Sequence, residues 1–208
     1  IVPSAIKYSD LKNLGLNKCQ IHYYAGFKED IYVADYIPNR NFFNEIPFKE
    51  YVVVRPEAYK AAYVRNNIIS LVPKLVKELL TKNLNIIYLP RYEEDYKLLE
   101  SSPRIFIPEE PLNGLDVCYH STCVLTGSGT LAREAACLGV PAVSFFPEEL
   151  LSVDLEMKKQ NLLFHSRSIK SIIEFIHSTK KSNKISSRSK EVKKDVIELL
   201  NEIIGHNQ

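Results

Sequence analysis

A glycine-rich turn carries the residues with the clearest chemical potential in this 208-residue sequence. Gly127, Ser128, Gly129 and Thr130 follow an apolar run and precede a helical pattern. The two glycines allow a tight turn and a close approach of a ligand to the backbone. The N–H groups that begin the next helix then face outward and, with the helix dipole, form an anion site suited to a diphosphate. The alternative is an ordinary tight turn with a Ser or Thr cap.

Glu134 is the second residue with a predicted binding role. It follows Thr130 by one helical turn and lies among small residues. A carboxylate accepts two hydrogen bonds side by side, which suits the two hydroxyls of a ribose. We therefore expect Glu134 and the glycine turn to contact the same ligand. The alternative is a solvated glutamate that the helix dipole favours.

The elements that must position these residues follow a regular alternation. Six short apolar runs predict buried parallel strands, because each is too short for a buried helix. They are Tyr51–Arg55, Asn85–Leu89, Arg104–Ile107, Thr122–Thr126, Ala142–Phe146 and Asn161–Phe164. Helical patterns lie between or after most of them, at Asn67–Leu80, Tyr92–Glu100, Leu131–Leu138, Ser168–Ser178 and Val192–Ile204. This alternation predicts an α/β fold with a Rossmann-like, doubly wound parallel sheet of about six strands.

Ligands of such a sheet bind outside the carboxyl ends of its strands. Arg55 and Glu57 stand at the end of the first run, and Arg91 follows the second. The glycine turn follows the fourth run. We therefore expect the two arginines to share one edge of the sheet with the turn.

The other segments suggest the domain organisation. We interpret residues 1–48, with an expected strand at Gln20–Tyr24, as an inter-domain segment or the remnant of a preceding domain. Residues 49–180 form the expected nucleotide-binding domain, and residues 181–208 a basic linker and a C-terminal helix with an apolar docking stripe. The sequence starts at Ile1 without a Met, as a fragment of a longer protein would.

Composition excludes several classes of protein. The net charge of +2 argues against a nucleic-acid binder, and no apolar run approaches the ~20 residues of a membrane-spanning helix. The scattered cysteines predict neither a disulfide framework nor a zinc site, and so indicate reduced thiols and a cytoplasmic protein. They are Cys19, Cys118, Cys123 and Cys137. Without an Asp-x-Asp motif, no metal is predicted.

Three segments resemble those of known enzymes. They are TGSGTLAREAACLGVPAVSFFP at Thr126–Pro147, YVVVRPEAYKAAYV at Tyr51–Val64 and YLPR at Tyr88–Arg91. The first resembles the nucleotide-sugar site of GT-B glycosyltransferases and UDP-N-acetylglucosamine 2-epimerases. Together they resemble the C-terminal half of a largely archaeal family of predicted glycosyltransferases, domain of unknown function 354. The resemblance implies the C-terminal domain of a GT-B fold, a UDP-sugar donor as substrate and no tightly bound cofactor.

The resemblance also implies roles for individual residues. Ser128–Thr130 would bind the diphosphate, Glu134 the ribose and Arg55 the phosphate charge, while Arg91 would flank the nucleotide. The planar guanidinium matches phosphate oxygens. The implied partners are a missing N-terminal Rossmann-like domain, which would carry acceptor recognition, or a second copy of the chain. No catalytic residue is predicted.

Two alternative functions stay open at this point. Gly127–Ala132 fits G-x-G-x-x-A, and Glu148 and Glu149 follow it by about 20 residues, as in an NAD-dependent oxidoreductase. Against this, the motif follows the fourth strand, whereas the fingerprint usually opens the domain. The other alternative is a non-catalytic Rossmann-like interaction module. Loss of binding on Glu134→Ala would indicate a nucleotide-sugar site, and loss on Glu149→Ala an NAD site.

Overall fold

A six-stranded parallel sheet forms the centre of the computed structural model, which describes residues 1–60, 69–182 and 187–205. Every neighbouring pair of strands in it is parallel. The strands are β3 (Val52–Arg55), β4 (Ile86–Tyr88), β5 (Ile105–Phe106), β6 (Cys123–Thr126), β7 (Ala142–Ser144) and β8 (Phe164–His165). The predicted α/β class and the parallel sheet are therefore confirmed.

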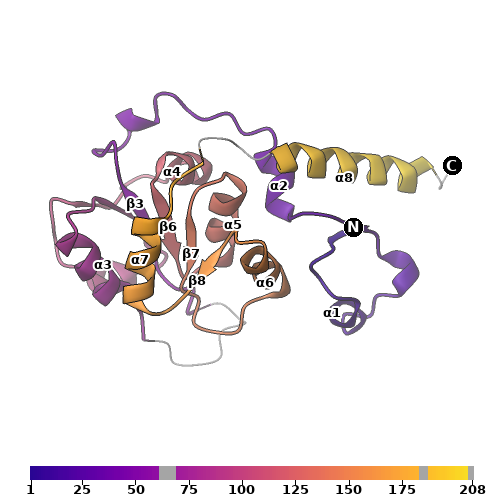
Figure 1. The fold of residues 1–208 in the computed structure, drawn as a ribbon, viewed down its shortest axis with the longest axis horizontal. Helices are drawn as coiled ribbons and strands as arrows, with labels where there is room; N and C mark the ends of the chain where they lie inside the picture. The colour runs from indigo at the N-terminus through magenta and orange to yellow at the C-terminus, as the bar shows by residue number, and fades with distance from the viewer. Residues whose placement is uncertain (61–68, 183–186, 206–208) are drawn as a thin grey trace.

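Helices cover both faces of this sheet (Figure 1). They are α3 (Val72–Thr81) and α7 (Ile169–Ser178) on one face, and α4 (Gly114–His120) and α5 (Gly129–Cys137) on the other. Successive strand residues point to opposite faces. Val53 accordingly belongs to the core under α5, whereas Val52 and Val54 belong to the core under α3. Strands buried on both sides explain the continuous apolar runs of the sequence.

The strand order places a crevice in the middle of the sheet. The order is β5-β4-β3-β6-β7-β8, so the chain moves outward from β3 on one side and then returns to β6 on the other. Ligands of open parallel sheets bind at such a reversal, outside the carboxyl ends of the strands. Arg55, the last residue of β3, pairs in register with Thr126, the last residue of β6. Arg55 and the glycine turn therefore flank the crevice.

The first 48 residues form two parts, one apart from the large sheet and one packed against its core. Their elements are β1 (Val2–Pro3), α1 (Tyr8–Lys12), η1 (Lys18–Gln20), β2 (Tyr23–Tyr24), α2 (Lys28–Val33) and η2 (Phe42–Asn44). β1 and β2 pair in a separate two-stranded sheet, and α1 lies apart from the large sheet in Figure 1. In contrast, Phe27, Val33 and Phe42 are buried in the core beneath α4 and α5. The second half of this segment thus packs as part of the α/β unit.

Several element boundaries differ from the sequence-based expectation. The first two residues of the helix expected at Asn67–Leu80 lie outside the described residues. Among the described residues the helix begins at Val72, because Glu57 accepts the amide of Leu71 and Pro73 occupies the first turn. The helix expected at Tyr92–Glu100 is the 3₁₀ helix η3 (Glu93–Leu98). Tyr59 donates to the buried carboxylate of Asp95 in that helix.

Strand ends differ as well. The strand expected at Asn161–Phe164 is the shorter β8, because Asn161 has a φ of 57° in the turn after the unpredicted helix α6 (Ser152–Lys159). The strand expected at Gln20–Tyr24 is reduced to β2, because Gln20 ends η1.

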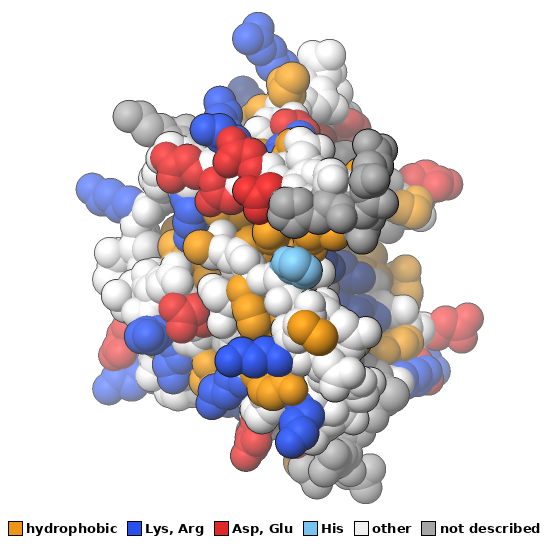
Figure 2. All heavy atoms as spheres, turned by 90° about the vertical axis from the view of Figure 1, so that its right-hand side faces the viewer, with side chains coloured by type: hydrophobic (Ala, Val, Ile, Leu, Met, Phe, Trp, Pro, Cys, Tyr) orange, Lys and Arg blue, Asp and Glu red, His pale blue; other side chains and the backbone are white. Residues whose placement is uncertain are grey.

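The basic C-terminal segment forms one long helix, α8 (Ser187–Gly205), which starts before the expected Val192. Val192 and Val196 pack against Tyr24, so one part of the predicted docking stripe is buried. Ile197, Leu200 and Ile204 are exposed. Figure 2 shows hydrophobic side chains between charged ones on this end of the molecule. In the described ranges, no helix has the length and apolar character needed to cross a membrane.

Candidate functional site

A cavity of about 470 Å³ opens at the carboxyl edge of the sheet, next to the β3–β6 crevice. Six of the seven site residues predicted from the sequence line it: Arg55, Arg91, Ser128, Gly129, Thr130 and Glu134. Leu131, Arg133, Phe146, Leu151 and Asp154 complete its wall. The six predicted residues, which span 79 positions of the sequence from Arg55 to Glu134, therefore meet at one cavity.

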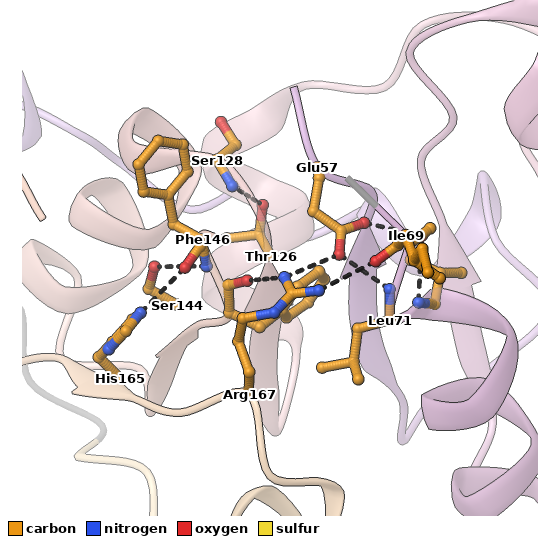
Figure 3. A network of polar contacts seen from close by, with 12 residues as sticks. Glu57, Ile69, Leu71, Thr126, Ser128, Ser144, Phe146, His165 and Arg167 are labelled. Carbon is orange, nitrogen blue, oxygen red and sulfur yellow. Dashed lines mark hydrogen bonds and ion pairs between the residues drawn. The ribbon is translucent and has the colours of Figure 1, made fainter. Parts of the chain in front are cut away.

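The glycine turn delivers the start of α5 to this cavity. Ser128 is the extended N-cap residue, and α5 begins at Gly129. The Ser128 amide donates a 3.0 Å hydrogen bond to Oγ1 of Thr126, as Figure 3 shows. In the described part of the chain, the Ser128 side chain makes no capping hydrogen bond. The first amides of a helix have no partner within the helix, so they are available to an anion in the cavity.

Gly127 packs closely against the backbone that follows β3. It does not line the cavity, and a Cβ atom added to it would lie 2.6 Å from Cα of Glu57. A glycine is therefore required here by the close approach of the backbone that follows β3. At Gly129 an added Cβ would meet Nη1 of Arg133 at 2.5 Å, which is the end of a flexible side chain.

Arg55 and Arg91 bring positive charge to the cavity. Nε of Arg55 is buried, and among the described residues it has no hydrogen-bond partner. A buried donor without a partner costs free energy unless a ligand or water satisfies it. The backbone of Arg91 is fixed in place by Asp95, because the Arg91 amide donates a 2.8 Å hydrogen bond to Oδ2 of Asp95. Both residues line the cavity, and a planar guanidinium matches phosphate oxygens.

Glu134 faces the cavity from the second turn of α5. Its Oε1 accepts a 2.9 Å hydrogen bond from the hydroxyl of Tyr32, on α2. Burial raises the pKa of Glu134, and the charge of Glu29 adds to this effect. The Tyr32 hydrogen bond and the charges of Arg55 and Lys28 act in the opposite direction. The Glu134 carboxylate is therefore partly shielded from solvent and lies near the positive charge of Arg55.

Arg133 was not predicted from the sequence, although it adjoins Glu134. Its Nε donates to Oε1 of Glu29 and its Nη1 to Oδ1 of Asp154, both at 2.9 Å. Both carboxylates are buried. Arg133 therefore ties α5 to α2 and α6 at the wall of the cavity. The sequence signal was weak, because neither α2 nor α6 was expected as a helix.

A second polar cluster lies at the same sheet edge. Glu57 is fully buried and receives Nη1 of Arg167 at 3.1 Å and the amide of Leu71 at 2.9 Å (Figure 3). The same Nη1 donates to the carbonyl of Phe145 at 2.7 Å. This cluster fixes the loops around the crevice and does not line the cavity.

Other types of site find little support in the described residues. Within ranges 1–60, 69–182 and 187–205, no group of three or more His, Cys, Asp or Glu side chains is arranged to hold a metal ion. Burial raises the pKa of the Cys118 and Cys123 thiols, so they are not reactive thiolates. Glu149, the acid expected for an NAD site, is exposed and outside the cavity wall, and Glu148 is also outside it.

The family is decided by a match along nearly the whole chain. Residues 1–207 match the family model described as "protein of unknown function (DUF354)". The chain belongs to this family. An uncharacterised protein of Methanocaldococcus jannaschii is 33% identical over 107 residues, which cover 51% of this chain and 31% of that relative. The resemblance that the sequence suggested is thereby confirmed.

Solved structures agree on the fold. The UDP-GlcNAc 2-epimerase of Methanocaldococcus jannaschii, in complex with UDP-GlcNAc and UDP, has a TM-score of 0.63 and 17% identity. The match covers 93% of this chain and 58% of that one. The Neisseria meningitidis enzyme bound to UDP-GlcNAc has a TM-score of 0.52 and 15% identity, with coverages of 94% and 52%. The chain therefore spans little more than half of either enzyme, and the likeness confirms a GT-B-like fold.

Proposed function

We propose that this chain is the donor-binding half of a GT-B-type glycosyltransferase or of an enzyme like the sugar-nucleotide epimerases. Its ligand is a nucleoside diphosphate sugar, with a UDP-sugar as the first candidate. The observation that carries the proposal is the convergence of Arg55, Arg91, the start of α5 and Glu134 on one cavity. The ligands named for the two epimerase structures support the same class.

The cavity offers a complementary group for each part of such a ligand. The amides at the start of α5 and the guanidinium of Arg55 suit the diphosphate, and Glu134 suits the ribose hydroxyls. When a sugar leaves a nucleoside diphosphate, negative charge develops on the β-phosphate. Donors that are already aimed at this position stabilise the transition state more than the ground state. We assign this leaving-group stabilisation to Arg55 and to the α5 amides, and we assign no catalytic base.

A dinucleotide site is less well supported. In a doubly wound sheet the dinucleotide fingerprint follows the first strand. Here Arg55, Pro56 and Glu57 stand at the end of β3, the first strand of the large sheet, whereas the glycine turn follows β6. Glu149 is also outside the cavity wall. NAD therefore serves as the competing ligand in the test.

Calorimetric titration of this chain with UDP, GDP, UDP-N-acetylglucosamine and NAD tests the proposal. We expect a nucleoside diphosphate to bind, and its binding to be lost or strongly weakened in Glu134→Ala. Glu149→Ala is the matched control, because it removes an exposed glutamate outside the cavity. Preference for NAD with sensitivity to Glu149 would indicate an oxidoreductase. Binding of none of the four ligands would contradict the proposal.

A further inference from the structure

We propose that Tyr32 is a positioning residue of the nucleotide site, whose hydroxyl fixes the Glu134 carboxylate so that it distinguishes ribose from 2′-deoxyribose. The inference rests on the function proposed above. It assigns a binding role to α2, which lies outside the strand–helix repeats of the large sheet.

The contact joins two helices that are distant in the sequence. Tyr32 and Glu134 are 102 positions apart, and the Tyr32 hydroxyl lies 2.9 Å from Oε1 of Glu134. α2 packs against α5 and α8. No other side-chain hydrogen bond to Glu134 is present in the described part of the chain. Tyr32 is thus the group that sets the orientation of this carboxylate.

α2 itself is held at several points, so it can act as a rigid support. Asp30 is fully buried and accepts hydrogen bonds from Ser189 at 2.7 Å and from Arg188 at 3.0 Å, both on α8. Glu29 binds Arg133, the neighbour of Glu134 on α5. Tyr32 therefore projects from a helix that is anchored on both sides.

The hydrogen bond leaves acceptor capacity for a ligand. An ionised carboxylate has about four lone-pair positions. Tyr32 uses one of them on Oε1, so Oε2 and the rest of Oε1 can accept from two adjacent hydroxyls. A carboxylate that is already oriented loses less conformational entropy when the ligand binds. A ligand without the 2′-hydroxyl cannot use this arrangement fully.

The pKa of Glu134 depends on the groups around it, so it can be used to test the role of Tyr32 without a ligand. Burial raises its pKa, and the Glu29 charge adds to this. Tyr32, Arg55 and Lys28 lower it. Cys118 on α4 has a raised pKa and is a neutral thiol, and Asp154 on α6 is paired with Arg133. Removal of the Tyr32 hydroxyl should therefore raise the Glu134 pKa further.

The first experiment measures the pKa of the Glu134 side chain in the free chain by carbon-13 NMR. We expect a higher pKa in Tyr32→Phe than in the unsubstituted chain. Tyr23→Phe is the matched control, because Tyr23 and Tyr32 are 40% and 39% exposed and Tyr23 does not belong to the cavity wall. An unchanged Glu134 pKa in Tyr32→Phe would contradict the inference.

The second experiment compares UDP with 2′-deoxy-UDP by calorimetry. Loss of one hydrogen bond should weaken UDP binding roughly threefold to tenfold in Tyr32→Phe and leave 2′-deoxy-UDP binding nearly unchanged. An equal loss for both ligands would indicate a merely structural role and overturn the inference. Absence of UDP binding by the unsubstituted chain would contradict the proposed function as well. If the unsubstituted chain binds UDP and Tyr32→Phe leaves the ratio of the UDP and 2′-deoxy-UDP affinities unchanged, only the inference about Tyr32 is contradicted.

Discussion

Glu57 and Arg167 form an ion pair that joins the loops after the first and last strands of the large sheet. Each lies two residues beyond the end of its strand, and Nη1 of Arg167 is 3.1 Å from Oε1 of Glu57. The Glu57 carboxylate is fully buried and also accepts hydrogen bonds from Ser70 and Leu71. The backbone of Glu57 is the surface on which Gly127 packs. The pair therefore supports the turn that presents the start of α5.

We expect Arg167→Ala to lower the free energy of unfolding by about 3 kcal/mol, because it leaves a buried carboxylate without its cation. Urea denaturation followed by circular dichroism measures this change. Lys60→Ala is the control, since it removes an ion pair with Glu94 in which both side chains are more than half exposed. Solvent screens such exposed pairs, so their contribution to stability is small. A similar loss in both variants would show that burial of Glu57 does not matter.

Gly127→Ala should destabilise the chain by about 1–3 kcal/mol, the usual cost of overpacking. The reason is the backbone of Glu57, which lies 2.6 Å from the added Cβ and has no room to move without disturbing β3. Thermal unfolding measures the effect. Gly114→Ala, at the start of α4, is the control because nothing lies within 4 Å of its added Cβ. Equal melting temperatures for both variants would refute the packing argument.

The sequence was informative where the pattern was local. Apolar runs such as that ending at Arg55 identified all six strands of the large sheet, and the positions of the glycine turn and Glu134 relative to them were correct. The partners of these residues could not be predicted, because they come from elements with weak periodicity. Tyr32 and Glu29 lie on α2, within the stretch interpreted as an inter-domain segment or the remnant of a preceding domain.

Short polar helices were missed for a related reason. α6 carries one fully buried apolar residue, Met157, and its Asp154 forms an ion pair with Arg133 on α5. α4 could have been found from Asn113, whose side chain accepts the amides of Leu115 and Asp116 as an N-cap. Hydrophobic periodicity does not detect helices that tertiary polar contacts stabilise.

Arg55→Ala should weaken UDP binding about tenfold or more, since hydrogen bonds to charged groups contribute about 1.5–3 kcal/mol. Stability should change little, because the buried Nε of Arg55 has no hydrogen-bond partner in the ranges that the structure covers. Calorimetric titration and urea denaturation measure the two quantities. Arg40→Ala is the matched control, as Arg40 is exposed and outside the cavity wall. Unchanged UDP affinity in Arg55→Ala would remove this residue from the site.

As pH is lowered, nucleotide affinity should begin to fall at a higher pH than it would if Glu134 had the pKa of an ordinary glutamate. Glu134 must be ionised to accept the ribose hydroxyls, and burial raises its pKa in the free chain. Affinity is therefore full above this raised pKa and is lost as pH falls through it. The nucleotide phosphate also titrates, with a pKa of about 6. Glu134→Gln keeps the phosphate contribution, so the difference between the two pH profiles isolates the carboxylate. Parallel profiles would contradict the assigned role of Glu134.

The most direct test of the account follows the backbone amides of this chain by nitrogen-15 NMR during a titration with UDP. The account predicts the largest chemical-shift changes at Gly129, Thr130 and Leu131, at the start of α5, with smaller changes around Arg55. Glu134→Ala should weaken the response without moving it elsewhere. Changes confined to the loops after β4 and β5, or no change at saturating UDP, would contradict a diphosphate site at the glycine turn.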